Sequence, residues 1–115
     1  MIDRTKKLQA RFYETSSGRK PVREWLLELS SEDRRVVCYD IETVEFGWPI
    51  GMPVCRPLGD GLWEVRSQLS SGTIGRVIFC IVNDGMVLLH GFVKKTRKTP
   101  QQEIELARKR RKEIE

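Results

Sequence analysis

Three consecutive segments of strand-like sequence, separated by short turns, dominate the second half of the chain. They cover residues 62–68, 73–82 and 86–95, and they contain many of the β-branched and aromatic residues that strands favour. Ser71-Gly72 separates the first two segments, and Asn83-Asp84-Gly85, a typical hairpin turn, separates the last two. We therefore predict an antiparallel meander at the centre of the fold.

Helical patterns flank the meander on both sides. Pro21 occupies a first helical turn and precedes apolar residues at helical spacing. Ser30 or Ser31 caps a second helix that ends near Gly47. A third helix starts near Thr99-Pro100, with Thr99 as its cap, and runs to the C-terminus.

The remaining segments complete a single domain. Residues 8–13 predict a weak first strand, and residues 47–61 predict an irregular connection rich in Pro and Gly. A length of 115 residues fits one domain over residues 1–115. We expect an α+β fold: an antiparallel sheet with an N-terminal helical hairpin on one face and a C-terminal helix.

Alternation of side chains along each strand predicts the two faces of the sheet. The face toward the N-terminal helices is expected to carry Trp63, Val65, Val77, Phe79, Ile81, Val87, Leu89, Gly91 and Val93. The other face is expected to carry Glu64, Arg66, Arg76, Ile78, Cys80, His90, Phe92 and Lys94. Arg66, Arg76 and Lys94 then form a basic surface beside Phe92, which suits phosphate neutralisation and base stacking.

The distribution of charge supports a polyanionic partner. Residues 1–89 hold 12 basic and 12 acidic side chains, whereas residues 90–115 hold 9 basic and 4 acidic ones. Such asymmetry points first to nucleic acid. Structural alternatives stay open: Glu64 pairs with Arg66 or Arg76, His90 is a partly buried, hydrogen-bonded residue, Phe92 packs under the C-terminal helix, and Arg108–Lys112 is a solvated helix face.

Several function classes are disfavoured by composition. The chain has 3 Cys without a CxxC pair and 1 His, which argues against a disulfide framework, a zinc finger and a histidine metal site. We expect no metal and no cofactor. No apolar run reaches the ~18 residues of a membrane span, and the start lacks the plan of a signal peptide. A reduced, cytoplasmic location is expected.

Three stretches resemble a known family: LWEVR (62–66), GRVIFCIV (75–82) and VLLHGFVKKTRKTPQQEIELAR (87–108). Nearly the whole chain is similar to the phage-derived HigB branch of the RelE/ParE toxin superfamily. The resemblance implies a RelE-like fold and the toxin half of a type II toxin–antitoxin pair. Many RelE-like members cut mRNA in the ribosomal A site. The implied partners are the ribosome, mRNA and a cognate antitoxin with a helix-turn-helix domain.

The resemblance also implies site residues. The family's strand arginines fall on Arg66 and Arg76, and its FxKK motif falls on Phe92, Lys94 and Lys95. The C-terminal tyrosine that some RelE toxins stack on the substrate base is missing. His90, Arg97 and Lys98 join Phe92 as expected substrate-binding residues.

The expected activity is that of a metal-independent endoribonuclease, an mRNA interferase that inhibits translation. In such a reaction the 2′-OH of RNA attacks the adjacent phosphate. Neighbouring cations disfavour the protonated form of a lysine, so Lys94, or else Lys95, is the hypothetical base. Arg66 and Arg76 would stabilise the charge that develops on phosphorus.

Two other functions remain as alternatives. A ParE-like protein would share the fold and inhibit DNA gyrase without catalysis. A non-catalytic nucleic-acid-binding protein of a prophage would have the charge and no activity.

Overall fold

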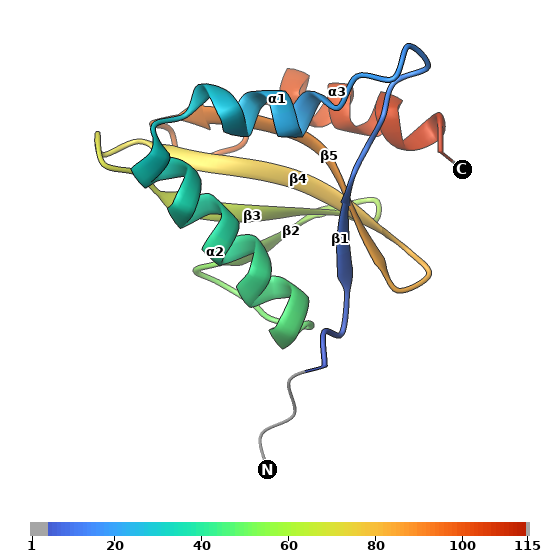
Figure 1. The fold of residues 1–115 in the computed structure, drawn as a ribbon, viewed down its shortest axis with the longest axis horizontal. Helices are drawn as coiled ribbons and strands as arrows, with labels where there is room; N and C mark the ends of the chain where they lie inside the picture. The colour runs from blue at the N-terminus through green and yellow to red at the C-terminus, as the bar shows by residue number, and fades with distance from the viewer. Residues whose placement is uncertain (1–4, 115) are drawn as a thin grey trace.

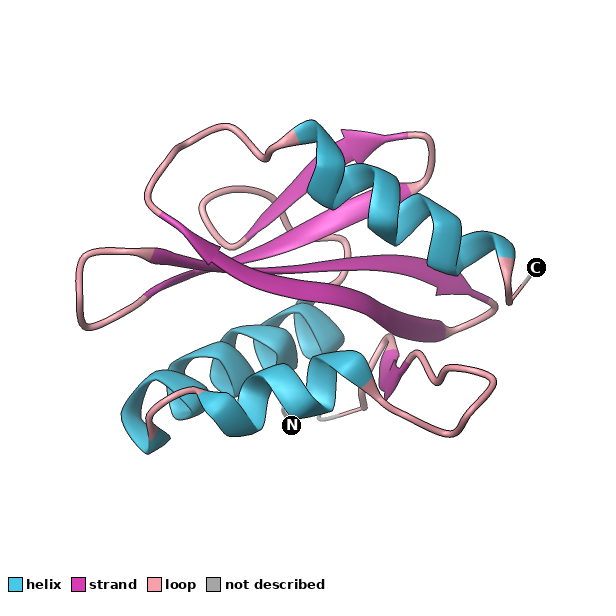
Figure 2. Ribbon diagram, turned by 90° about the horizontal axis from the view of Figure 1, so that it is seen from above, coloured by secondary structure: helices cyan, strands magenta, loops and turns pink. Residues whose placement is uncertain are grey.

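A five-stranded sheet with helices on both faces forms the core of the computed structural model, which describes residues 5–114 (Figure 1). The elements in chain order are β1 (Gln9–Phe12), α1 (Pro21–Glu28), α2 (Ser31–Gly47), β2 (Cys55–Gly59), β3 (Leu62–Gln68), β4 (Ile74–Val82), β5 (Gly85–Lys94) and α3 (Gln101–Lys112). Figure 2 shows α1 and α2 on one side of the sheet and α3 on the other. The predicted α+β class is confirmed.

The strands lie in the order β1-β5-β4-β3-β2. The predicted meander of β3, β4 and β5 is confirmed, and β2 adds to it in antiparallel orientation. However, β1 pairs with β5 in parallel, so the sheet is mixed and the expectation of a wholly antiparallel sheet is wrong at this edge. The partner of a strand so distant in sequence is not encoded in its local pattern.

Local sequence signals explain the helical hairpin. Pro21 begins α1, and Val22 and Leu26 form its buried stripe. The Ser30 side chain accepts a hydrogen bond from the Asp33 backbone N–H at 3.1 Å, so Ser30 is the N-cap of α2. Both helices begin where the sequence predicted.

Within residues 5–114, no helix combines the length and the apolar character needed to cross a bilayer.

Two expectations about local structure, at residues 55–59 and at the start of α3, are wrong. Residues 55–59, expected to be irregular, form β2, where Pro57 is tolerated because the strand lies at the sheet edge. The N-cap of α3 is Pro100 rather than Thr99, and Pro100 makes no side-chain cap hydrogen bond. The Thr99 hydroxyl is engaged elsewhere, in contacts with two side chains of the sheet.

Each face of the sheet supports its own hydrophobic core. The core under α1 and α2 includes Val37, Val44, Val65, Val77 and Phe79, and the core under α3 includes Ile78, Cys80, Leu89, Phe92 and Ala107. Ile78 pairs with His90 whereas Phe79 pairs with Leu88, so β5 has a bulge at Leu89. The bulge reverses the alternation, and Val87 and Leu89 therefore face α3 rather than the hairpin, contrary to prediction.

Close packing of α1 on β5 depends on Gly91. A Cβ atom at this position would lie 2.5 Å from Trp25 Cε3 and 2.8 Å from Trp25 Cδ2. Gly91→Ala is therefore expected to displace the indole ring and to lower the free energy of unfolding by about 1–3 kcal/mol. Urea denaturation followed by tryptophan fluorescence measures this loss.

Gly51→Ala is the matched control, because a Cβ atom at Gly51 would meet nothing within 4 Å. It is expected to change stability by less than ~0.5 kcal/mol, as is usual for surface positions. Equal stability of the Gly91 and Gly51 variants would contradict the close contact between α1 and β5.

Candidate functional site

Three neighbouring strands bring three arginines and one glutamate together on the α3 side of the sheet. In the β2–β3 ladder Arg56 pairs with Glu64, and in the β3–β4 ladder Arg66 pairs with Arg76. In the β4–β5 ladder Arg76 also pairs with Phe92. We call Arg56, Glu64, Arg66 and Arg76 the arginine cluster.

Glu64 is the carboxylate of this cluster and is fully buried. Its Oε1 accepts a hydrogen bond from Arg66 Nη1 at 2.8 Å, and its Oε2 accepts one from the Thr99 hydroxyl. The structural alternative, in which Glu64 pairs with Arg66, is thus confirmed. Thr99 connects this carboxylate to the segment that joins β5 to α3.

Arg76 is also fully buried, although it carries a charge. Its Nη1 donates to Thr99 Oγ1 at 3.3 Å, and its guanidinium lies 6.0 Å from the centre of the Phe92 ring. Within residues 5–114, its Nε and Nη2 atoms have no hydrogen-bond partner. Burial holds the pKa of Arg76 below its ordinary value, although Glu64 acts in the opposite direction.

The expectation of an accessible basic sheet face is wrong. The Arg66 side chain is 9% exposed, and Phe92 is 7% exposed as a residue. Helix α3 covers part of this face, because its residues Ile104 and Ala107 pack into the core under α3. Residues 95–100 cover another part, where the Arg97 carbonyl and the Thr99 hydroxyl contact the arginines. Phe92 therefore packs under α3, as the structural alternative for this residue stated.

The basic run after Phe92 lies at the surface. Exposed side chains occupy positions 94–98, which include Lys94, Lys95, Arg97 and Lys98. The expectation that Lys94 faces Arg66 and Arg76 is wrong. Lys94 pairs with Ile74, so it lies two residues beyond Phe92 along β5. The base and its proposed electrostatic partners are consequently separated along the strand.

Arg56 is a member of the cluster that the sequence did not indicate. Its Nη1 donates to the Arg97 carbonyl oxygen at 3.3 Å, and Arg66 Nη1 donates to the same oxygen at 3.2 Å. The sequence offered no signal for Arg56, because residues 47–61 did not reveal β2. Only the pairing of β2 with β3 places this side chain beside Glu64.

His90 lies between Phe92 and α3. Its ring stacks on Phe92 with centroids 5.4 Å apart, Nε2 lies 3.3 Å from Glu103 Oε1, and Nδ1 lies 3.4 Å from Arg110 Nη1. Burial lowers the pKa of His90 despite the opposing effect of Glu103. These contacts fit a neutral ring that donates to Glu103 from Nε2 and accepts from Arg110 at Nδ1.

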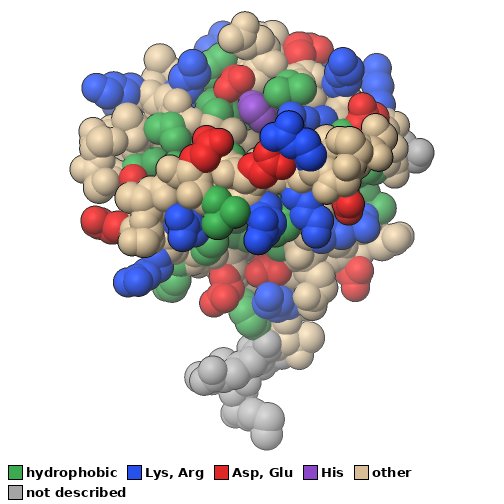
Figure 3. Space-filling model, turned by 45° about the horizontal axis from the view of Figure 1, so that its top comes forward, with side chains coloured by type: hydrophobic (Ala, Val, Ile, Leu, Met, Phe, Trp, Pro, Cys, Tyr) green, Lys and Arg blue, Asp and Glu red, His purple; other side chains and the backbone are tan. Residues whose placement is uncertain are grey.

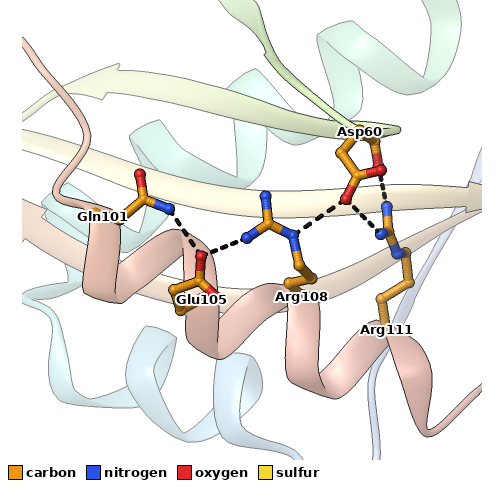
Figure 4. A network of polar contacts seen from close by, with 5 residues as sticks. All are labelled: Asp60, Gln101, Glu105, Arg108 and Arg111. Carbon is orange, nitrogen blue, oxygen red and sulfur yellow. Dashed lines mark hydrogen bonds and ion pairs between the residues drawn. The ribbon is translucent and has the colours of Figure 1, made fainter.

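Much of the basic C-terminal helix is used to hold that helix in place (Figure 4). Arg108 Nε and Arg111 Nη2 contact Asp60 Oδ2 at 3.1 and 3.2 Å, and Arg110 Nη1 donates to the Leu89 carbonyl at 2.8 Å. Arg111 and Arg108 lower the pKa of Asp60, chiefly through hydrogen bonds. On the face seen in Figure 3, cations and carboxylates intermingle.

A family comparison covers most of the elements that form this site. The family model described as phage-derived protein Gp49-like matches residues 24–112. No curated protein matches the chain. Because the matched region extends from α1 to the end of α3 and covers well over half of the sequence, the chain belongs to the phage-derived Gp49-like family.

Proposed function

We propose that the protein is the toxin of a type II toxin–antitoxin pair and that it acts as a ribosome-dependent mRNA interferase. Membership in the phage-derived Gp49-like family is compatible with this function. The resemblance to HigB-like toxins supports it further, and we infer a RelE-like arrangement on the same ground. The implied site of action is the cytoplasm, with an antitoxin of the helix-turn-helix type as partner.

The observation that carries the proposal is the arginine cluster. The cluster holds three guanidinium groups on adjacent strands and one carboxylate, which forms its ion pair with Arg66, so the cluster has an excess of positive charge. Fixed cations of this kind stabilise the negative charge that develops on phosphorus during phosphodiester cleavage. A purely structural cluster would be expected to balance its charges, because unpaired buried charge is costly.

In the reaction that we propose, this chain supplies the base, the acid and the cations. Lys94, or else Lys95, takes the proton of the 2′-OH while its oxygen bonds to phosphorus and the bond from phosphorus to the 5′-oxygen breaks. Arg66 and Arg76 are buried, so they stabilise the pentavalent phosphorus only when residues 95–100 move aside and RNA reaches the cluster beside Lys94. A neighbouring cation protonates the departing 5′-oxygen. The products are a 2′,3′-cyclic phosphate and a 5′-hydroxyl. The ribosome holds the mRNA in position for this attack.

The burial of Arg66 and Arg76 is compatible with a non-catalytic alternative, inhibition of DNA gyrase. Both residues contact protein atoms and lie beneath other segments, as they would if their role were structural. A gyrase inhibitor with this fold would need no catalytic cations.

A reconstituted translation reaction with stalled ribosomes and a defined mRNA distinguishes the two functions. Primer extension is expected to reveal cuts in register with codons, and only when ribosomes are present. A parallel DNA supercoiling assay tests the alternative. Intact mRNA together with lost gyrase activity, from correctly folded protein, would replace the interferase proposal with gyrase inhibition.

A further inference from the structure

The Arg97 carbonyl oxygen is an acceptor shared by two arginine side chains. The guanidinium groups of Arg56 and Arg66 converge on it from two different strands, at 3.3 and 3.2 Å. Two positively charged donors around one oxygen are typical of the recognition of phosphate oxygens. The segment that follows β5 thus places a neutral oxygen where the cluster is suited to an anionic one.

Within residues 5–114, the charges of the arginine cluster are not balanced, because it holds three arginines and one glutamate. Glu64 forms its ion pair with Arg66. Burial, and after it the like charges of Arg66 and Arg56, lower the Arg76 pKa. Since a carbonyl oxygen carries no net charge, the excess positive charge of the cluster persists. An anion bound at this position would reduce the repulsion among the three arginines.

Arg76 provides an independent observation. Its Nε and Nη2 atoms are buried and, among the described residues 5–114, have no hydrogen-bond partner. A buried donor without an acceptor is unfavourable, and such groups in native structures often belong to functional sites. The unsatisfied donors lie in the same cluster that receives the Arg97 carbonyl.

The segment that covers the cluster, residues 95–100, is attached to the sheet by polar contacts. The Thr99 hydroxyl donates to Glu64 and accepts from Arg76, and the Arg97 carbonyl accepts from Arg56 and Arg66. Its basic side chains, Lys95, Arg97 and Lys98, are exposed. A phosphate oxygen can therefore take the place of the Arg97 carbonyl as the acceptor of Arg56 and Arg66, while the exposed cations stay available to neighbouring phosphates.

We propose that Arg56 and Arg66 form a phosphate subsite for RNA, and that the Arg97 carbonyl fills this subsite until a backbone phosphate displaces it. Arg56 is then a further substrate-binding residue, and residues 95–100 are an internal cover of the site. The inference rests on the proposed function, because it assigns RNA as the ligand. It explains why the arginine cluster lies beneath a segment of its own chain.

Binding of a short, uncleavable 2′-O-methyl RNA oligonucleotide tests the subsite without ribosomes or catalysis. Fluorescence anisotropy at several salt concentrations gives the slope of log K against log salt, which for single strands is about 0.7 per phosphate contact. Arg56→Gln is expected to reduce the magnitude of this negative slope by about 0.7, because one phosphate contact is lost. Arg35→Gln, which removes the same charge from an exposed position of α2 on the opposite face, is expected to leave it unchanged.

A second variant tests the cover. Thr99→Val removes the hydroxyl that contacts Glu64 and Arg76 with little change of shape, and we expect tighter binding of the oligonucleotide. An unchanged slope in Arg56→Gln, or no binding by the wild-type protein at low salt, would overturn the subsite. Weaker binding by correctly folded Thr99→Val would overturn the cover.

The outcomes separate this inference from the proposed function. Protein that binds the oligonucleotide through Arg56 but leaves ribosome-bound mRNA intact retains the subsite and rejects the interferase. Protein that cuts mRNA but loses no phosphate contact in Arg56→Gln retains the interferase and rejects the subsite.

Discussion

Arg76→Met is expected to reduce cleavage of ribosome-bound mRNA by about 10²–10³-fold, the usual effect of losing one preorganised donor to a developing anion. The same substitution is expected to leave stability unchanged or to raise it by about 1–2 kcal/mol. Glu64 keeps Arg66 as its ion-pair partner, so the substitution leaves no buried carboxylate unpaired and removes the cost of burying the guanidinium. Glu64 keeps its bonds to Arg66 and Thr99 in this variant.

The two effects are measured separately, by single-turnover cleavage and by urea denaturation. Arg35→Met, at an exposed position of α2, controls for the loss of one positive charge. An Arg76→Met protein that cuts mRNA at the wild-type rate would exclude Arg76 from the reaction. A loss of more than ~2 kcal/mol in stability would indicate that Arg76 is in the core for structural reasons.

Glu64→Gln is expected to lower the free energy of unfolding by about 3–5 kcal/mol, the usual cost of removing one partner of a buried ion pair. Glutamine keeps the shape of the side chain, so the loss reports charge rather than packing. Without the carboxylate, Arg66 loses its ion-pair partner and Arg76 loses the nearby negative charge that favours its protonated form. Urea denaturation provides the measurement.

Two further variants make this prediction specific. Glu42→Gln, at an exposed position of α2, is expected to change stability by less than ~0.5 kcal/mol. The double variant Glu64→Gln/Arg76→Met is expected to recover part of the loss, because neighbouring substitutions in one network are not additive. A loss below ~1 kcal/mol in the Glu64→Gln variant would contradict the importance of the Glu64–Arg66 ion pair.

The helices and the central meander were predictable because their signals are local. Pro21, the Ser30 cap and the Asn83-Asp84-Gly85 turn each specify backbone geometry within a few residues. In contrast, β2 was missed because Pro57 argues against a strand unless that strand is known to lie at an edge. The bulge at Leu89 was also missed, and it reverses which side chains face each core.

The register of the candidate site was predictable in part, whereas its burial was not. Alternation placed Glu64, Arg66, Arg76 and Phe92 on one face correctly. The sequence left the cover over this face open, with Phe92 under the C-terminal helix as one alternative, because α3 has a highly polar sequence that is typical of a solvated helix. It docks through long-range polar contacts, such as those of Arg108 and Arg111 with Asp60, which no periodicity reveals.

The end groups of the RNA produced on stalled ribosomes provide the most direct test of the proposed function. Wild-type protein is expected to produce a 3′ fragment with a 5′-hydroxyl and a 5′ fragment with a 2′,3′-cyclic phosphate. An mRNA with a 2′-deoxy nucleotide at the cut position is expected to stay intact, because the attacking oxygen is missing. Fragments that begin with a 5′-phosphate, or intact mRNA with correctly folded protein, would contradict cleavage by 2′-OH attack.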